Sequence, residues 1–137
     1  MDKSFDYFDH DADIGIIGRG ATVEQAFEAA ADAMFAIMAK PARRVTSTTI
    51  HFVFTETDLE LALVTWLNRL LAEARTGGLM LFSFQLKRDG SRWAGSAEGC
   101  PWARTGERGV EVKGATLTAL SVRSDASGTE ARCVVDV

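Results

Sequence analysis

Two stretches of this chain repeat apolar residues at the spacing of an amphipathic helix, and this pattern constrains the fold most. The first stretch, at about 23–39, begins after Thr22, and Gln25 completes a helix-capping box with that threonine. The second begins after Thr57, which forms the same kind of box with Glu60, and it ends at a Gly-Gly pair. We therefore expect two helices.

The other segments alternate in polarity or are rich in β-branched and aromatic residues, which favours strands. The expected strands are 5–8, 13–17, 46–54, 80–87, 92–99, 110–112, 117–122 and 131–137. Asp89-Gly90 predicts a hairpin turn, and 100–109 is predicted to be a mobile loop because it mixes proline, glycine and charges. No strand-helix-strand rhythm repeats. The sequence therefore predicts an α+β fold, one domain over 1–137, with a mainly antiparallel or mixed β-sheet carrying two α-helices on one face.

Composition and charge exclude several classes of protein. The chain has 137 residues, of which 47% are apolar, enough for the core of one domain. No apolar run is long enough to span a bilayer and the first residues lack a signal-peptide core, so we expect a cytoplasmic protein without membrane association. A net charge of -4 disfavours tight, direct binding to nucleic acid. Cys100 and Cys133 lack the spacing of a zinc or redox pair.

The two ends of the chain carry the residues most suited to binding a metal. Asp13 lies near the start, and Asp136 precedes Val137 at the end of the sequence. If the last strand pairs with an early one, both side chains and the α-carboxylate of Val137 converge into the all-oxygen ligand set that a hard divalent cation requires. The spacing leaves an alternative open, in which the two aspartates are acids at strand ends and bind nothing.

Three further residues can support such a site. His10 lies just before Asp13 and can orient it, donate to a phosphate or ligate the metal, unless it is a hydrogen-bonded turn residue. Asp11 is an additional acid in the same segment. Lys113 precedes Gly114 in a flexible segment, where its ammonium group can meet a phosphate or a partner's carboxylate, or remain solvated.

The sequence contains no pattern typical of catalysis. No serine or cysteine stands in a nucleophile elbow, and no pair of acids is spaced as in a protease or glycosidase, so we predict no catalytic residue. Trp102 lies within 100–109, and an aromatic residue in an exposed loop is typical of an interface. Arg104, Arg108 and Lys113 flank this loop and form a small basic rim, which can contact RNA phosphates or an acidic partner, or serve solubility alone.

Several segments resemble the archease family. Residues 10–16, His-Asp-Ala-Asp-Ile-Gly-Ile, are similar to the family's opening His-Thr-Ala-Asp-Ile-Gly, and 22–27 resembles the Glu-x-Ala-Phe helix that follows it. Further along, 58–67 is similar to the family's second helix, 111–116 to its Glu-Val-Lys-Ala segment, and 136–137 to its closing Asp-Ile. The resemblance spans nearly the whole chain.

This resemblance implies a compact fold related to strand-helix-strand-strand modules, and a function. An archease is a non-catalytic activator of the RtcB-type RNA ligase, which acts in tRNA splicing and RNA repair, and it promotes guanylation of the ligase and multiple turnover. The family's divalent ion, calcium in crystals with magnesium or manganese as further candidates, implies Asp13, Asp136 and Val137 as ligands, and Lys113 as a residue near the ligase. A small metal-dependent phosphoesterase and a chaperone-like binding module remain as alternatives.

Two segments depart from the family pattern. Asp11 stands where the family usually has threonine, which adds a negative charge beside the expected ion. Leu117 and Thr118 replace the tyrosine and histidine that follow the family's lysine segment, so any role of those two side chains is missing here. Both changes leave the oxygen ligands intact and bear on how the protein docks to a ligase.

Overall fold

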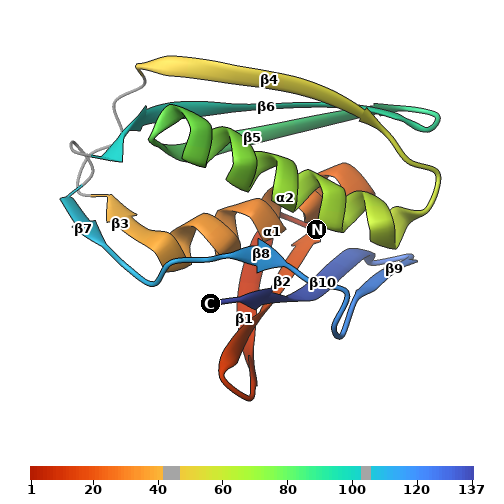
Figure 1. Cartoon of the computed structure of the whole chain (residues 1–137). Coiled ribbons are helices and arrows are strands. Elements are labelled where there is room, and N and C mark those ends of the chain that lie inside the picture. The colour runs from red at the N-terminus through yellow and green to blue at the C-terminus, as the bar shows by residue number, and fades with distance from the viewer. Residues whose placement is uncertain (42–46, 103–105) are drawn as a thin grey trace.

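The computed structural model describes residues 1–41, 47–102 and 106–137. In it, two helices lie between two groups of strands (Figure 1). The helices are α1 (Val23–Met38) and α2 (Leu59–Gly77), and the strands are β1 (Ser4–His10), β2 (Asp13–Gly20), β3 (Ala39–Pro41), β4 (Thr48–Thr55), β5 (Leu79–Asp89), β6 (Arg92–Pro101), β7 (Gly106–Arg108), β8 (Gly114–Ala115), β9 (Ser121–Asp125) and β10 (Gly128–Asp136). Every pairing among these strands is antiparallel. The predicted α+β class is confirmed.

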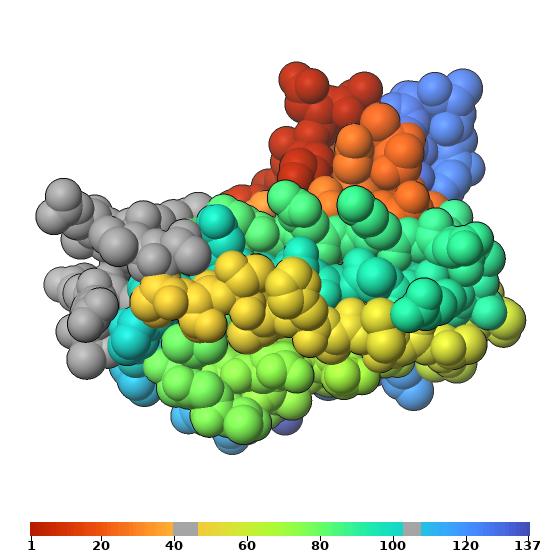
Figure 2. Space-filling model, turned by 90° about the horizontal axis from the view of Figure 1, so that it is seen from above, coloured from red at the N-terminus to blue at the C-terminus, as the bar shows by residue number. Residues whose placement is uncertain are grey.

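The strands form three sheets in the described part of the chain, where the sequence analysis expected one. The largest has the order β1-β2-β10-β8, with β9 also pairing with β10; β4-β6-β5 forms a second and β3-β7 a third. Helix α1 contacts β2 and β10 on one side and β5 on the other, while α2 contacts β5 and β8, so the helices lie between the two larger sheets (Figure 1). The outer face of the β4-β6-β5 sheet forms one side of the molecule (Figure 2).

Helix α1 begins as its sequence predicts and packs closely on β2. The Thr22 hydroxyl accepts a hydrogen bond from the Gln25 amide at 3.1 Å, and the Gln25 side chain accepts one from the Ala21 amide at 3.0 Å. A side chain at Gly18 of β2 would collide with the helix backbone at Ala26 and Ala30. Glycine at this position therefore lets the strand lie directly on the helix.

Aromatic side chains from both helices and the β4-β6-β5 sheet fill the core. Trp66 of α2 is fully buried, and its indole N–H donates to the carbonyl of Phe27 in α1 at 2.9 Å. Trp93 of β6 stacks between Phe27 and Phe54, with ring centroids 5.4 and 5.8 Å away. The buried face of α2 is the predicted apolar stripe. These contacts hold α2 rigidly between the sheets.

The predicted capping box at the start of α2 is wrong. The N-cap residue is Asp58, whose Oδ1 accepts from the Leu61 amide at 3.0 Å. The Glu56 carboxylate accepts from the amides of Thr57 and Asp58, so no Thr57–Glu60 box forms. An aspartate carboxylate is at least as good an acceptor for a helix start as a threonine hydroxyl, and here it stands one position later.

The hairpin predicted at Asp89-Gly90 forms with a turn shifted by one residue. Asp89 still pairs with Arg92, and the turn begins at Gly90, whose φ is 60°. The regular alternation predicted for β5 is also broken, because Ser83 has a φ of 54° and the register with β6 shifts there. Before this shift the strand does not alternate, because Leu81 and its neighbours Met80 and Phe82 are all buried.

Three predictions for the chain from 100 to 122 are wrong. The expected mobile loop at 100–109 contains the end of β6 and all of β7, which pairs with β3; residues 103–105, with Arg104, lie outside the described part of the chain. No regular strand forms at 110–112. The expected strand at 117–122 is interrupted by a turn at Ala119, whose φ is 53°, and β9 begins only at Ser121.

Candidate metal-binding corner

The two ends of the chain meet at one end of the largest sheet. Strands β2 and β10 are neighbours, with Val135 directly opposite Ile14, so Asp13 and Asp136 occupy the next position toward the same sheet end. The Val137 amide donates a hydrogen bond to Oδ1 of Asp13 at 3.2 Å. The pairing on which the sequence argument depended is therefore present.

Asp13 faces away from helix α1. Gly18, on the same strand, faces the helix. Successive residues of a strand point to opposite faces, so Asp13, five positions earlier, points to the other face. His10 of β1 lies directly opposite Asp13, so the two side chains share this outer face. In the next row the Phe8 ring covers Gly15, where any side chain would collide with the ring. An apolar ring thus borders the corner on its inner side.

Asp11 occupies the tight turn between β1 and β2. Its φ is 52°, in the left-handed region that aspartate tolerates better than β-branched threonine. Its side chain is 94% exposed, and Oδ2 lies 3.9 Å from Nδ1 of His10. Asp11 therefore fits the turn conformation and adds negative charge at the solvent edge of the corner.

Lys113 reaches the corner through its backbone. Its amide donates to the carbonyl of Asp136 at 2.7 Å, and the following Gly114 pairs with Asp136 as part of β8. The Lys113 side chain is exposed. The structure thus brings four predicted residues, Asp13, Asp136, Val137 and Lys113, into one place, with His10 beside them.

The candidate metal ligands in this corner are negatively charged carboxylate groups. Asp13 is half-buried, Asp136 is exposed, and neither forms an ion pair with any described residue. Among residues 1–41, 47–102 and 106–137, no three side chains of histidine, cysteine, aspartate or glutamate form a metal-binding group, so a cation here would depend on two aspartates and the carboxylate of Val137. Carboxylate oxygens favour a hard cation whose remaining positions are filled by water. The ligand set itself stays a prediction.

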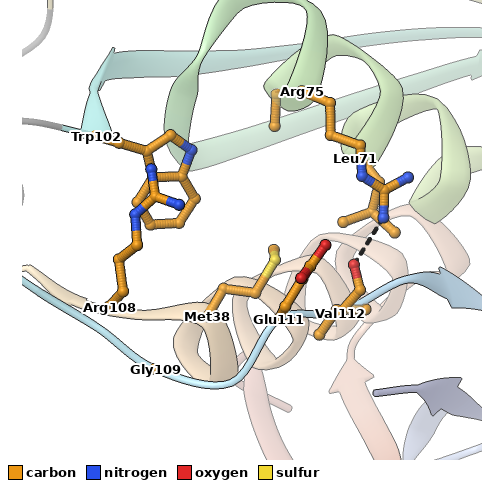
Figure 3. Close-up of a pocket in the computed structure, with 9 residues that line it drawn as sticks. Met38, Leu71, Arg75, Trp102, Arg108, Gly109, Glu111 and Val112 are labelled. Atoms are coloured by element: carbon orange, nitrogen blue, oxygen red, sulfur yellow. Dashed lines mark hydrogen bonds between the residues drawn. The ribbon is translucent and has the colours of Figure 1, made fainter.

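A separate pocket opens on the other side of Lys113. It has a volume of about 150 Å³ and lies between the end of α1, helix α2 and the segment 108–112 (Figure 3). Trp102 forms one wall, with the Arg108 guanidinium 4.5 Å from its ring. Sequence analysis expected a basic rim and an interfacial tryptophan here. The structure shows Arg108 stacked on Trp102, and both expectations stay predictions.

Sequence analysis missed two polar residues of α2 that contact the corner's edge. Asn68 hydrogen-bonds to Ala115, and Arg75 donates to the carbonyls of Val112 and Lys113. Seven residues separate them, so they lie on one face of the helix. The available signal was a pair of polar residues at that spacing beside the buried stripe, which is too common to single out.

Comparison with known proteins identifies the family. The model of the Archease protein family matches residues 5–137. This chain belongs to the Archease family. Among its relatives, the archease of Methanosarcina mazei is 31% identical over 98% of this chain and 97% of that protein. The archease of Methanothermobacter thermautotrophicus is 30% identical over 98% of this chain and 99% of that protein.

Solved structures of archeases share the fold. The solution structure of Methanobacterium thermoautotrophicum protein 1598 matches with a TM-score of 0.87 and 28% identity, covering 97% of this chain and 98% of that one. The crystal structure of a Thermotoga maritima archease, described as a possible chaperone, matches with a TM-score of 0.66 at 18% identity, covering 95% of this chain and 94% of that one. The second likeness shows the fold alone. In the described residues, no helix is long and apolar enough to cross a membrane.

Proposed function

We propose that this archease is a non-catalytic, cytoplasmic activator of an RtcB-type RNA ligase in tRNA splicing or RNA repair. It raises guanylation and multiple turnover of the ligase through a divalent cation held at the corner by Asp13, Asp136 and the Val137 carboxylate. Family membership supports the choice of partner. The observation that carries the proposal is the meeting of Asp13 with Val137 across β2 and β10.

The corner's own residues suit this role. A bound calcium, magnesium or manganese ion would supply a concentrated positive charge that attracts phosphate oxygens. Asp13, half-buried and hydrogen-bonded to the Val137 amide, would be the more fixed ligand, while the exposed Asp136 adapts to the ion. His10, opposite Asp13 on the same face, would orient its carboxylate or a phosphate.

Charge favours docking to a protein over docking to RNA. The chain has a net charge of -4, and the corner adds unpaired carboxylates at one tip of the molecule. A basic cleft, such as one that binds RNA, attracts such a tip. The exposed side chain of Lys113, whose backbone bonds to Asp136, can then pair with a carboxylate or phosphate at the mouth of that cleft.

The main experiment measures multiple-turnover RNA ligation by the ligase with and without this protein. Asp13→Ala and Asp136→Ala are expected to lose stimulation because each removes an anionic ligand. Asp89→Ala is the matched control, since it removes an exposed carboxylate at the far end of β5. Full stimulation by both corner variants, each shown to be folded, would reject the proposal.

A second experiment tests the terminal carboxylate. Residues appended after Val137 convert its carboxylate into an amide, so stimulation and ion binding are expected to fall, whereas the same residues added before Met1 are expected to have no effect. Phosphate-ester hydrolysis by the isolated protein, abolished by a chelator, would instead indicate an enzyme. Equal activity toward unrelated client proteins, insensitive to both aspartates, would indicate a general chaperone.

A further inference from the structure

Helix α2 holds the edge of the corner with two side chains. Oδ1 of Asn68 accepts from the Ala115 amide at 2.9 Å, and Nδ2 donates to the Ala115 carbonyl at 3.2 Å. Nη2 of Arg75 donates to the carbonyls of Val112 and Lys113, each at 2.7 Å; Figure 3 shows the bond to Val112. Four hydrogen bonds thus join one face of α2 to the backbone of 112–115.

The other side of 112–115 carries the end of β10. Ala115 pairs with Val135, Gly114 pairs with Asp136, and the Lys113 amide donates to the Asp136 carbonyl at 2.7 Å. Strand β8 has only 2 residues, too few to be stable through strand pairing alone. The side chains of α2 therefore supply the hydrogen bonds that a neighbouring strand supplies elsewhere in a sheet.

The helix that makes these bonds is itself packed firmly in the core. Its buried residues Leu67, Leu70 and Leu71 surround Asn68 in sequence, and all are at most 2% exposed. The C-terminal residues 136–137, in contrast, lie beyond the last residue pair of β2 and β10. Chain ends of this kind fray unless they are tied down. The connection from α2 through 112–115 is one of their attachments, beside the Val137–Asp13 hydrogen bond and the packing of the Val137 side chain against the core.

We propose that Asn68 and Arg75 are positioning residues of the corner: by holding 112–115 against α2, they fix Asp136 and Val137 in reach of Asp13. The relevance to ion binding rests on the proposed function, whereas the positioning of the chain end does not. Linkage requires the reverse effect as well, so a bound ion must slow opening of 112–115. Neither residue touches the ion, and both act through backbone groups.

The first test measures amide exchange and amide chemical shifts by NMR without any added ion. Asn68→Ala and Arg75→Gln are expected to speed exchange at Ala115 and Lys113 and to shift the Val137 amide. The control is Arg69→Ala, on the same helix, because Arg69 instead contacts the Val53 carbonyl at 3.4 Å and the Phe52 ring at 4.8 Å. It is expected to leave the Val137 amide unchanged.

The second test measures binding of calcium or manganese alone by calorimetry. Loss of residues that orient metal ligands typically weakens affinity about 10-fold or more, which is expected for Asn68→Ala and Arg75→Gln. Arg75→Lys, which can still donate to one carbonyl, is expected to keep part of the affinity. The control Arg69→Ala is expected to keep the full wild-type affinity. If Asn68→Ala does not fold, Asn68→Asp is used in its place, because it keeps the acceptor for the Ala115 amide and removes only the donor to the Ala115 carbonyl.

The outcomes separate this inference from the proposed function. Unchanged Val137 amides and unchanged ion affinity in folded variants, with ion binding by the wild-type protein, would overturn the positioning role and leave the ion site standing. If the Val137 amide shifts in the variants but the wild-type protein binds no ion, the positioning of the chain end is supported and the ion site is rejected. Equal weakening by Arg69→Ala would also overturn the inference, because the effect would then be general destabilisation.

Discussion

Cys133 and Asp136 lie on the same strand, β10, in two regions that are held in different ways. Cys133 is fully buried against α1, in a core where apolar packing determines stability. Asp136 is exposed, in a corner held by a few hydrogen bonds between side chains and backbone. Apolar packing in the core therefore determines the position of β10, and the residues at the end of this strand remain available for binding. Substitutions in the first should change stability, and substitutions in the second should change binding.

The largest effect is expected from the core tryptophan. Trp66→Ala removes a fully buried ring and leaves the Phe27 carbonyl without its donor, so the free energy of unfolding should fall by about 3–5 kcal/mol. Trp102→Ala, which truncates a half-buried tryptophan at the surface pocket, should cost less than about 2 kcal/mol. Urea denaturation of both variants measures the difference. Equal losses would contradict the division between core and surface.

Burial of Cys133 in the core predicts that the free energy of unfolding depends on pH above pH 9. Desolvation raises the pKa of its thiol from 9.0 to about 12. The folded pKa lies above the unfolded one, so this contribution is complete below pH 9 and is lost as pH rises toward 12, at about 1.4 kcal/mol for each pH unit. Cys133→Ala should lower stability near neutral pH but lack this slope. Parallel stability curves for the two proteins above pH 9 would refute it.

The helix starts offer a smaller effect that tests the corrected cap. Asp58→Ala and Thr22→Ala each remove the acceptor for an amide of the first turn, so each should cost about 1 kcal/mol. Thr57→Ala should change stability by less than about 0.5 kcal/mol, because Thr57 is not the cap. Thermal denaturation of the three variants compares them. A larger cost for Thr57→Ala than for Asp58→Ala would restore the predicted capping box.

The sequence predicted the core better than the corner's supports, for a physical reason. Helix positions, the apolar stripe of α2 and the strands near both termini follow from local periodicity, which each segment carries by itself. The split into separate sheets, the bulge at Ser83 and the short β8 depend on contacts between distant segments. Asn68 and Arg75 are ordinary helix residues in sequence, and only the packing of α2 beside 112–115 gives them a role. The corner's aspartates were found because they stand at the two ends.

The smallest effect on stability is expected at the corner, and it sharpens the comparison most. Without a divalent ion, Asp136→Ala should change the free energy of unfolding by less than about 0.5 kcal/mol, because the side chain is exposed and forms no ion pair with the described residues. Calcium at 100 times its dissociation constant should stabilise the wild-type protein by about 2.7 kcal/mol and leave the variant unchanged. Unfolding followed with calcium and with a chelator separates the two states. Equal stabilisation of both proteins by calcium would place the ion elsewhere, since removing a carboxylate ligand must weaken binding at the corner and so reduce the stabilisation.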